Sequence, residues 1–147
     1  MNQIARDPAL AQVVDTMIDL TRLSDAQRVV LAGADSVGAY LALRNRGFRQ
    51  AATIAGIHVA GLPYQVGLIA GRHSLQALEA HLARVSRYLD VHAAIALSLD
   101  SREGIPSLRI HARLERIGFR IEAGVRCSQM LVLSAYRQGF CEMKKAA

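Results

Sequence analysis

The residues most suited to binding chemistry form a glycine turn between an apolar segment and a segment with helical periodicity. The segment reads RVVLAGADSVGAYLALRNRGF over residues 28–48, and its turn spans Gly33 to Gly38. A short buried strand, a glycine turn and an immediate helix start together form the usual frame of a nucleotide-cofactor site. The pattern therefore predicts a ligand-binding turn, and the residues inside it decide which ligand suits it.

Two phosphate-binding patterns fit this turn poorly. A P-loop has the sequence GxxxxGK[ST], and the spacing from Gly33 to Gly38 agrees with it. However, Ala39 and Tyr40 replace the lysine and the hydroxyl residue that hold phosphate and magnesium. A dinucleotide site has the sequence GxGxxG, whose middle glycine admits the pyrophosphate, and Asp35 stands there with a negative charge. The turn is predicted to favour a ligand without phosphate.

A second candidate group follows another apolar run, QVGLIAG at residues 65–71. Arg72 and His73 come directly after it, and open α/β sheets bind ligands beyond the carboxyl ends of their parallel strands. His73 could act as a base, and Arg72 could hold an acidic substrate. The alternative is that His73 merely precedes Ser74, the expected cap of the next helix.

The other histidines, cysteines and arginines indicate no separate centre. The histidines lack the close spacings of zinc sites; they are His58, His73, His81, His92 and His111. Cys127 is predicted to be a core or turn residue, and GLPY at 61–64 is predicted to be a turn. Arg109, Arg113 and Arg116 share one helical face, which we interpret as a solvated stripe, with a weak polyanion contact as the alternative.

The composition indicates one compact domain of 147 residues, with 52% hydrophobic and 20% charged residues. No apolar run is long enough to cross a bilayer, and the N-terminus lacks the features of a secretory signal. Two cysteines without a CxxC pair favour a cytoplasmic location. The net charge of +6 comes from 16 arginines and two lysines, which are scattered along the chain with few aromatics beside them.

Hydrophobic periodicity predicts alternating helices and strands. Helices are expected at about 8–23, 36–46, 74–89 and 106–118, and strands at 28–33, 51–56, 65–71, 92–99, 119–126 and 129–137. The last two strands lie close enough in the chain to pair as an antiparallel hairpin. Right-handed crossovers then predict a three-layer α/β/α sandwich with a mainly parallel sheet, into which the final strand inserts antiparallel.

This pattern resembles the class I S-adenosylmethionine-dependent methyltransferase-like superfamily from about Val29 to Arg137. VVLAGADSVGAYLAL is similar to the family's first motif, and LRIHARLERIGFRIEAG followed by MLVLSAYR is similar to its last helix and closing hairpin. YQVGLIAG and LQALEAHLARVSRYLDVHAAIALSL are similar to its fourth strand, the following helix and the fifth strand. The resemblance implies a Rossmann-like methyltransferase fold with S-adenosylmethionine as cofactor. It implies these contact residues: Gly33, Ala34, Asp35, Ser36 and Gly38, with Gly56 and Gly71 as loop neighbours.

The chain departs from the family's pattern in three places: two acidic residues are absent, and one crossover segment is short. Leu31 stands two residues before the first glycine, and residues 54–56 (IAG) end the second strand, where the family has acidic residues. A ribose without its acidic acceptor loses about 1.5–3 kcal/mol, or roughly ten- to a hundredfold in affinity. Only IHVAGLPYQ (57–65) precedes the next confident strand, so the third strand is expected to be missing or shortened, with IHVAG as a stub.

The residues therefore predict a short, divergent, bacterial protein of this type, with one domain over 1–147. Its parts are an N-terminal helix region at 1–25, a core at 28–137 and a tail at 138–147. The predicted function is that of a methyltransferase-like protein with weakened or lost cofactor binding, and whether it is an enzyme stays open because no residue stands out as a catalytic acid or base. One alternative is a non-enzymatic relic that pairs copies through a bared sheet edge; another is a basic nucleic-acid-associated module.

Overall fold

The computed structural model describes residues 8–57, 63–100, 107–127 and 129–137. The helices of this part are α1 (Pro8–Thr21), α2 (Ser36–Asn45), the 3₁₀ helix η1 (Ile54–Gly56), α3 (Leu75–Ser86) and α4 (Ser107–Arg116). The strands are β1 (Val29–Ala32), β2 (Ala51–Thr53), β3 (Tyr64–Ile69), β4 (Leu89–Asp100), β5 (Phe119–Cys127) and β6 (Met130–Arg137).

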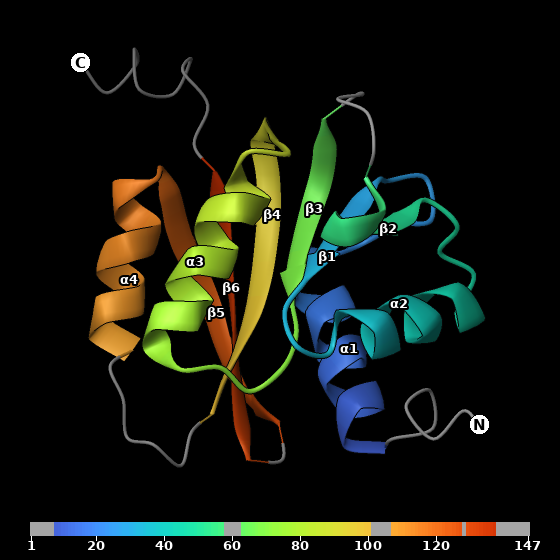
Figure 1. Ribbon diagram of the computed structural model, residues 1–147, viewed down its shortest axis with the longest axis horizontal. Helices are drawn as coiled ribbons and strands as arrows, with labels where there is room; N and C mark the ends of the chain where they lie inside the picture. Colours follow the sequence, from blue (N-terminus) through green and yellow to red (C-terminus); the bar gives the residue numbers. More distant parts are fainter. Residues whose placement is uncertain (1–7, 58–62, 101–106, 128, 138–147) are drawn as a thin grey trace.

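The strands form a single six-stranded sheet in the order β2-β1-β3-β4-β6-β5 (Figure 1). Strands β2, β1, β3 and β4 are parallel, and β6 pairs antiparallel with both β4 and β5. The insertion of the last strand between β4 and β5 confirms the predicted hairpin ending. The mainly parallel sheet with helices between its strands confirms the predicted α/β class.

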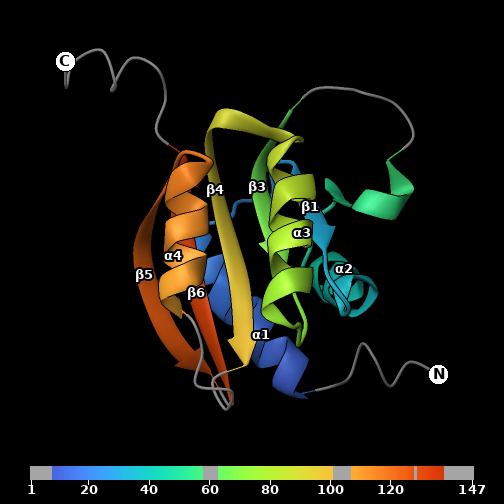
Figure 2. The same ribbon diagram turned by 60° about the vertical axis from the view of Figure 1, so that its left-hand side comes forward.

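Helices cover both faces of the sheet, with α3 and α4 on one face and α1 on the other (Figures 1 and 2). The alternation of side chains along β1 explains why two cores form. Val29 and Leu31 pack into the cluster that contains the apolar faces of α1 and α2, whereas Val30 and Ala32 pack into the cluster under α3 and α4. Both faces of β1 are buried, as expected for a parallel strand between two helical layers.

Several predicted boundaries need correction. The second strand ends at Thr53, where its pairing with Leu31 stops, and residues 54–56 turn into η1 instead of continuing the strand. In η1 the N–H of Ile57 donates to the carbonyl of Ile54 at 3.2 Å. Tyr64, predicted to lie in a turn, is the buried first residue of β3. Strand β4 begins at Leu89, which the periodicity assigned to the preceding helix.

The predicted stub of a third strand falls mostly on residues 58–62, which lie outside the described residues. Within the described part of the chain, β2 is the outermost strand on its side of the sheet. The predicted tail at 138–147 also lies outside the described residues. Among the helices that the structure describes, none is both long and apolar enough to cross a bilayer.

Candidate functional site

The glycine turn after β1 is built by a close approach to the end of β3. Gly33 has a φ of +103°, and a Cβ placed on it would lie 2.3 Å from the carbonyl oxygen of Ala70. That carbonyl accepts the N–H of Asp35 at 3.0 Å, which ties the turn to the neighbouring strand. Any side chain at position 33 would therefore push the two strand ends apart.

The turn leads directly into α2, as predicted. Asp35 occupies the N-cap position, but its carboxylate makes no capping hydrogen bond and is exposed to solvent. The carbonyl of Asp35 accepts the N–H of Ala39 at 2.9 Å, and the N–H of Ser36 donates to Gly33 at 3.2 Å. Gly38 is buried in the first turn of the helix. The turn thus presents a carboxylate outward while its backbone is held internally.

The end of β3 is fastened to β4 by a buried serine. Ser98 is only 1% exposed, and its Oγ accepts the N–H of Gly71 at 3.2 Å. The same hydroxyl donates to the carbonyl of Gly71 at 3.0 Å. Gly71 has a φ of +131°, and a Cβ placed on it would lie 3.1 Å from both the Cβ of Ala34 and the backbone nitrogen of Asp35. The segment after β3 is therefore packed against the glycine turn.

His73 lies on the same turn. Its Nε2 accepts the N–H of Ala34 at 2.9 Å, and its ring centroid is 4.8 Å from that of His81 in α3. Burial lowers the pKa of His73, the neighbouring His81 lowers it further, and the Asp35 carboxylate acts in the opposite direction. A neutral ring whose Nε2 is an acceptor carries its proton on Nδ1. Nδ1 is buried and has no hydrogen-bond partner among the described residues.

Ser74 also has the role that the sequence predicted for it. Its hydroxyl oxygen accepts the N–H of Ala77 at 3.1 Å and caps α3. His73 does precede this cap, but its ring is turned back onto the glycine turn. The two interpretations of His73 are therefore compatible, because the cap fixes the backbone and leaves the ring available for the turn.

A pocket of about 120 Å³ lies between the first turns of α1 and the carboxyl ends of the parallel strands. Its lining residues come from α1, the glycine turn and the strand ends; they are Ala9, Leu10, Val13, Asp35, Gly71, Arg72, Ser98 and Met130. Arg72 pairs with Asp100 at 3.3 Å, and the side chain of Asp100 is 8% exposed whereas that of Arg72 is 50% exposed. The pocket wall thus carries one exposed anion and one half-exposed cation.

Some predicted residues lie away from this group. Gly56 ends η1, is exposed, and has only the Thr53 hydroxyl near the position of a Cβ, at 3.3 Å. Leu31, at the place of the family's first acid, is fully buried in the core between the sheet and the helices α1 and α2. An ionised side chain there would be desolvated without a partner. This burial explains why the chain has an apolar residue at that position.

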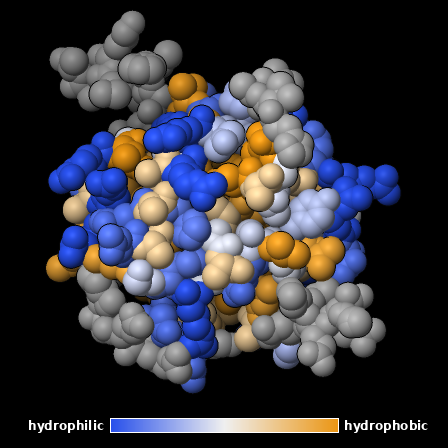
Figure 3. Space-filling view, viewed as in Figure 1, coloured by the Kyte–Doolittle hydropathy of each residue, from blue (hydrophilic) through white to orange (hydrophobic). Residues whose placement is uncertain are grey.

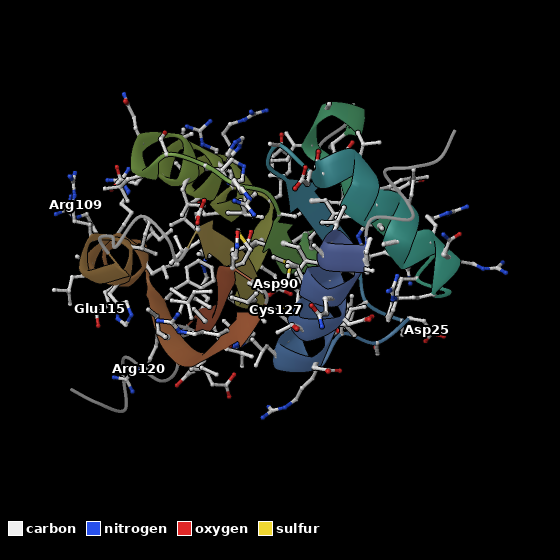
Figure 4. All side chains as sticks on the ribbon, turned by 90° about the horizontal axis from the view of Figure 1, so that it is seen from below. Asp25, Asp90, Arg109, Glu115, Arg120 and Cys127 are labelled. Carbon is white, nitrogen blue, oxygen red and sulfur yellow. The ribbon has the colours of Figure 1, made fainter. Side chains whose placement is uncertain are left out.

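The remaining candidates are structural or outward-facing. Cys127 is buried beside α1, where its sulfur accepts the hydroxyl of Thr16 at 3.6 Å (Figure 4). Arg109 and Arg116 are exposed on α4, and Arg113 is half-buried. Among the described residues, no three His, Cys, Asp or Glu side chains group as metal ligands. These residues add no second chemical centre to the described part of the chain.

Ser98, Met130 and the α1 residues line the pocket and were not predicted from the sequence, and neither was Asp100, which pairs with the lining residue Arg72. Ser98 had a readable signal, because it is a hydroxyl within the otherwise apolar run HAAIALSL. Asp100 could be noticed only as the next polar residue of the same strand. The apolar face of α1 indicates a core contact, and nothing in its periodicity distinguishes a core contact from a pocket wall.

Comparisons with known proteins identify the fold. A scan against protein-family models finds no match to this chain, and a search of curated proteins finds none either. A methyltransferase from Aquifex aeolicus that depends on S-adenosylmethionine (SAM) has 12% identity to the chain and a TM-score of 0.62, covering 93% of this chain and 98% of that chain.

Two further solved structures agree. Magnesium protoporphyrin IX methyltransferase from Synechocystis, solved with bound SAM, has 14% identity and a TM-score of 0.58, covering 94% of this chain and 84% of that one. A TehB-like SAM-dependent methyltransferase from Corynebacterium glutamicum has 15% identity and a TM-score of 0.56, covering 88% of both chains. These likenesses show that the chain has a class I methyltransferase-like fold, as the motifs predicted.

Proposed function

We propose that this chain, which has the class I methyltransferase-like fold, binds S-adenosylmethionine or its demethylated product at the glycine turn. The observation that carries the proposal is the pair of positive-φ glycines, Gly33 and Gly71, packed together at the carboxyl ends of β1 and β3. Glycines in such conformations, where a Cβ would clash, hold the backbone in a turn that other residues would distort. Ligands of open α/β sheets bind at this edge.

The residues present fit the amino-acid end of the cofactor. That end carries an ammonium and a carboxylate, and the pocket wall carries the exposed Asp35 carboxylate and the half-exposed Arg72 guanidinium. Asp35 would hold the ammonium, and Arg72 would hold the carboxylate while keeping its contact with Asp100. This assignment explains why a carboxylate is tolerated in the glycine turn.

The residues fit the ribose end less well. The segment after β2 consists of Ile54, Ala55 and Gly56, which offer backbone groups but no carboxylate to the ribose hydroxyls. The missing charge-assisted hydrogen bond is worth about 1.5–3 kcal/mol. The proposed affinity is therefore roughly ten- to a hundredfold weaker than that of a site with the acid.

The bound cofactor would supply an electrophilic methyl group on a sulfonium. The contribution of the protein is to hold the donor at the strand ends and to position an acceptor beside it, which can lower the barrier without a strong base. His73 contacts the turn and could act as a base, but its Nε2 is already engaged by Ala34. Methyl transfer is accordingly proposed for acceptors that lose their proton readily.

Isothermal titration calorimetry with S-adenosylmethionine and S-adenosylhomocysteine tests the proposal. We expect weak, saturable binding by the natural sequence. Ala55→Asp introduces a carboxylate at an exposed position of η1, just after β2, and should tighten binding up to roughly tenfold. Ala112→Asp adds the same charge at an exposed position of α4 and serves as the matched control. Absence of heat with both ligands, in the natural sequence and in Ala55→Asp, would overturn the proposal.

A second candidate function is an interaction module that pairs copies through the sheet edge. The supporting observation is that β2 is the outermost strand on its side of the described sheet, where an edge strand can offer backbone groups to another chain. Association through the face covered by α3 and α4 is less well supported, because apolar and hydrophilic residues are interspersed on that face (Figure 3). Sedimentation velocity over a hundredfold range of protein concentration distinguishes a dimer from a monomer, and a monomer throughout would eliminate this candidate.

A further inference from the structure

His73 fills the space that the missing side chain of Gly33 leaves open. A Cβ placed on Gly33 would lie 3.0 Å from the Cε1 of His73, and one placed on Gly71 would lie 3.1 Å from the same atom. The ring therefore lies in van der Waals contact with both glycines of the turn. A glycine is useful at a ligand site because a ligand can approach its backbone closely. Here a side chain of the protein itself makes that approach.

The same ring also accepts a hydrogen bond from the backbone of the turn, as no other described side chain is seen to do. The N–H groups of Asp35 and Ser36 donate to the carbonyls of Ala70 and Gly33, so both are paired within the backbone. The N–H of Ala34 donates to Nε2 of His73 instead. Backbone pairs are fixed by the fold, whereas a side chain can change its rotamer and release its partner.

We propose that His73 is an internal ligand of the glycine turn, which must leave before the cofactor binds and which leaves when its ring is protonated. The part of this inference that concerns displacement by the cofactor rests on the proposed function. The internal contact itself is a property of the protein without any ligand and can be measured separately.

The contact between ring and turn is finely balanced. It gains the hydrogen bond from Ala34, but it leaves the Nδ1–H of the ring buried without a partner among the described residues. An unsatisfied buried donor costs at least as much as a typical hydrogen bond contributes. A ligand that offers its own acceptor to Ala34 can therefore displace the ring at small cost.

Protonation works against the contact for a geometric reason. A charged imidazolium carries a proton on Nε2 as well as on Nδ1, so it would direct an N–H at the N–H of Ala34. The charged and titratable groups that face the ring are Asp35 from the turn and His81 from α3, while the adjacent Arg72 is paired with Asp100 of β4. Burial and Arg84 lower the pKa of His81, so His81 too favours its neutral form beside the ring.

The sign of the pH dependence follows from these groups. Burial and His81 hold the pKa of His73 in the contact below the ordinary value of 6.5, despite the opposing Asp35. Between that lowered value and 6.5 the released ring binds more protons than the engaged ring, so acidification through this window favours release. Well above pH 6.5 both forms are neutral, and the ring stays on the turn.

Nuclear magnetic resonance of the ligand-free protein tests the contact itself. We expect the ring nitrogens of His73 to show the Nδ1–H form at pH 8, and the amide signal of Ala34 to shift with the same midpoint as His73. His92 is exposed on β4, and its ring signals provide the comparison within the same protein. A His73 ring in the opposite tautomer, or an Ala34 amide that ignores its titration, would show that the ring does not accept this N–H.

Calorimetry with S-adenosylhomocysteine between pH 5 and 8 tests displacement. Affinity of the natural sequence should rise as the pH falls through the His73 titration. His73→Ala should bind roughly two- to tenfold tighter at pH 8, with the pH dependence removed. His73→Gln keeps a polar side chain without a titrating group and should also lose the pH dependence, and His92→Ala should behave as the natural sequence.

The outcomes separate the two proposals. If the ligand binds but neither pH nor substitution of His73 changes its affinity, the internal ligand is wrong and the proposed function stands. If neither the natural sequence nor any variant binds the ligand, the proposed function is wrong, and displacement by the cofactor is wrong with it. The internal contact still stands in that case if the Ala34 amide signal shifts with the titration of His73.

Discussion

At the scale of single residues, Gly33 and Gly47 offer a comparison that separates backbone strain from steric contact. Both have positive φ, +103° and +92°, but a Cβ on Gly33 would collide with the Ala70 carbonyl whereas a Cβ on Gly47 would meet nothing within 4 Å. Gly47→Ala should therefore cost only backbone strain, about 1–2 kcal/mol. Gly33→Ala should cost clearly more and should abolish cofactor binding, because the strand ends must separate.

Urea unfolding of both variants, with calorimetry on the folded protein, checks this prediction. The difference in the free energy of unfolding between Gly33→Ala and Gly47→Ala isolates the contact with Ala70. Equal losses would mean that β1 and β3 do not end as closely together as the structure has them.

Ser98 is the second residue for which a specific loss is expected. Its Oγ satisfies both the N–H and the carbonyl of Gly71 in a buried site. Ser98→Ala leaves these two groups unpaired and should lower the free energy of unfolding by about 1–3 kcal/mol. Ser86→Ala is a suitable control, because the Ser86 hydroxyl donates to the carbonyl of Ala83 within a helix turn that retains its backbone pairing. A loss no larger than in the control would contradict the role of Ser98.

The glycine turn was predictable at this scale, and its internal partners were not. The residue type and local spacing of Gly33 and Gly38 are enough to predict a turn. The contact from Ala34 to His73 joins residues 39 positions apart, and it depends on β1 lying beside β3. Strand order is a tertiary property, so the sequence could place His73 at a strand end without indicating which turn its ring would contact.

At the scale of elements, Arg137 of β6 contacts three other elements: β4, α3 and β5. Its guanidinium donates to the carbonyls of Leu89 and Asp90 at the start of β4 and to that of Ser86 at the end of α3, and it stacks 4.8 Å above the Phe119 ring. A lysine cannot supply this fork of donors. Arg137→Lys should therefore lower the free energy of unfolding by about 1–3 kcal/mol.

Arg120→Lys provides the matched control in thermal and urea unfolding, because Arg120 is exposed on β5 (Figure 4). It should change stability by no more than about 0.5 kcal/mol. If Arg137→Lys were equally mild, the contacts between β6, β4 and α3 would not depend on the guanidinium.

The packing of α3 on the sheet gives a second prediction for elements. A Cβ on Gly67 in β3 would lie 2.7 Å from a methyl group of Val85, so Gly67→Ala should overpack this contact and cost about 1–3 kcal/mol. Val85→Ala removes that methyl group, and the double variant should be more stable than the sum of the two single losses predicts. A double-mutant cycle by urea unfolding measures the difference, and strict additivity would argue against direct contact.

Element identities were largely predictable, while some ends were not. Apolar spacing predicted each of the four described α-helices, and an apolar run predicted each buried parallel strand. Residues 54–56 were predicted to continue β2, and they form η1 because pairing with β1 stops at Thr53. Such an end is decided by the length of the neighbouring strand, which the local residues of β2 do not encode.

At the scale of the whole molecule, the fold was predictable because independent signals agreed. The two-sided burial of β1, the helices α2 and α3 that follow β1 and β3, and the closing hairpin all require the same three-layer arrangement. The site was less predictable because it is assembled where α1 meets the strand ends. The approach of Leu10 and Val13 to Asp35 and Arg72 depends on how α1 lies across the sheet.

The distribution of charge over the whole molecule bears on the nucleic-acid hypothesis. The net charge is +6, but exposed arginines lie on different elements, with Arg46 just after α2, Arg84 on α3, Arg109 on α4 and Arg126 on β5. A scattered positive charge attracts any polyanion weakly and without sequence preference, at dissociation constants of about 10⁻⁴–10⁻⁶ M at physiological salt. We expect single-stranded RNA of unrelated sequences to bind with equal, salt-sensitive affinity in this range.

Fluorescence anisotropy with two labelled RNAs between 50 and 200 mM salt measures this expectation. Replacing Arg109, Arg113 and Arg116 of the α4 stripe with glutamine removes at most three phosphate contacts, so the slope of log affinity against log salt should fall by no more than about two. The prediction favours a solvated stripe over a built interface. Affinity much tighter than micromolar that distinguishes the two RNAs at 150 mM salt would require a recognition surface, and the basic-module hypothesis would then replace the cofactor proposal as the leading function.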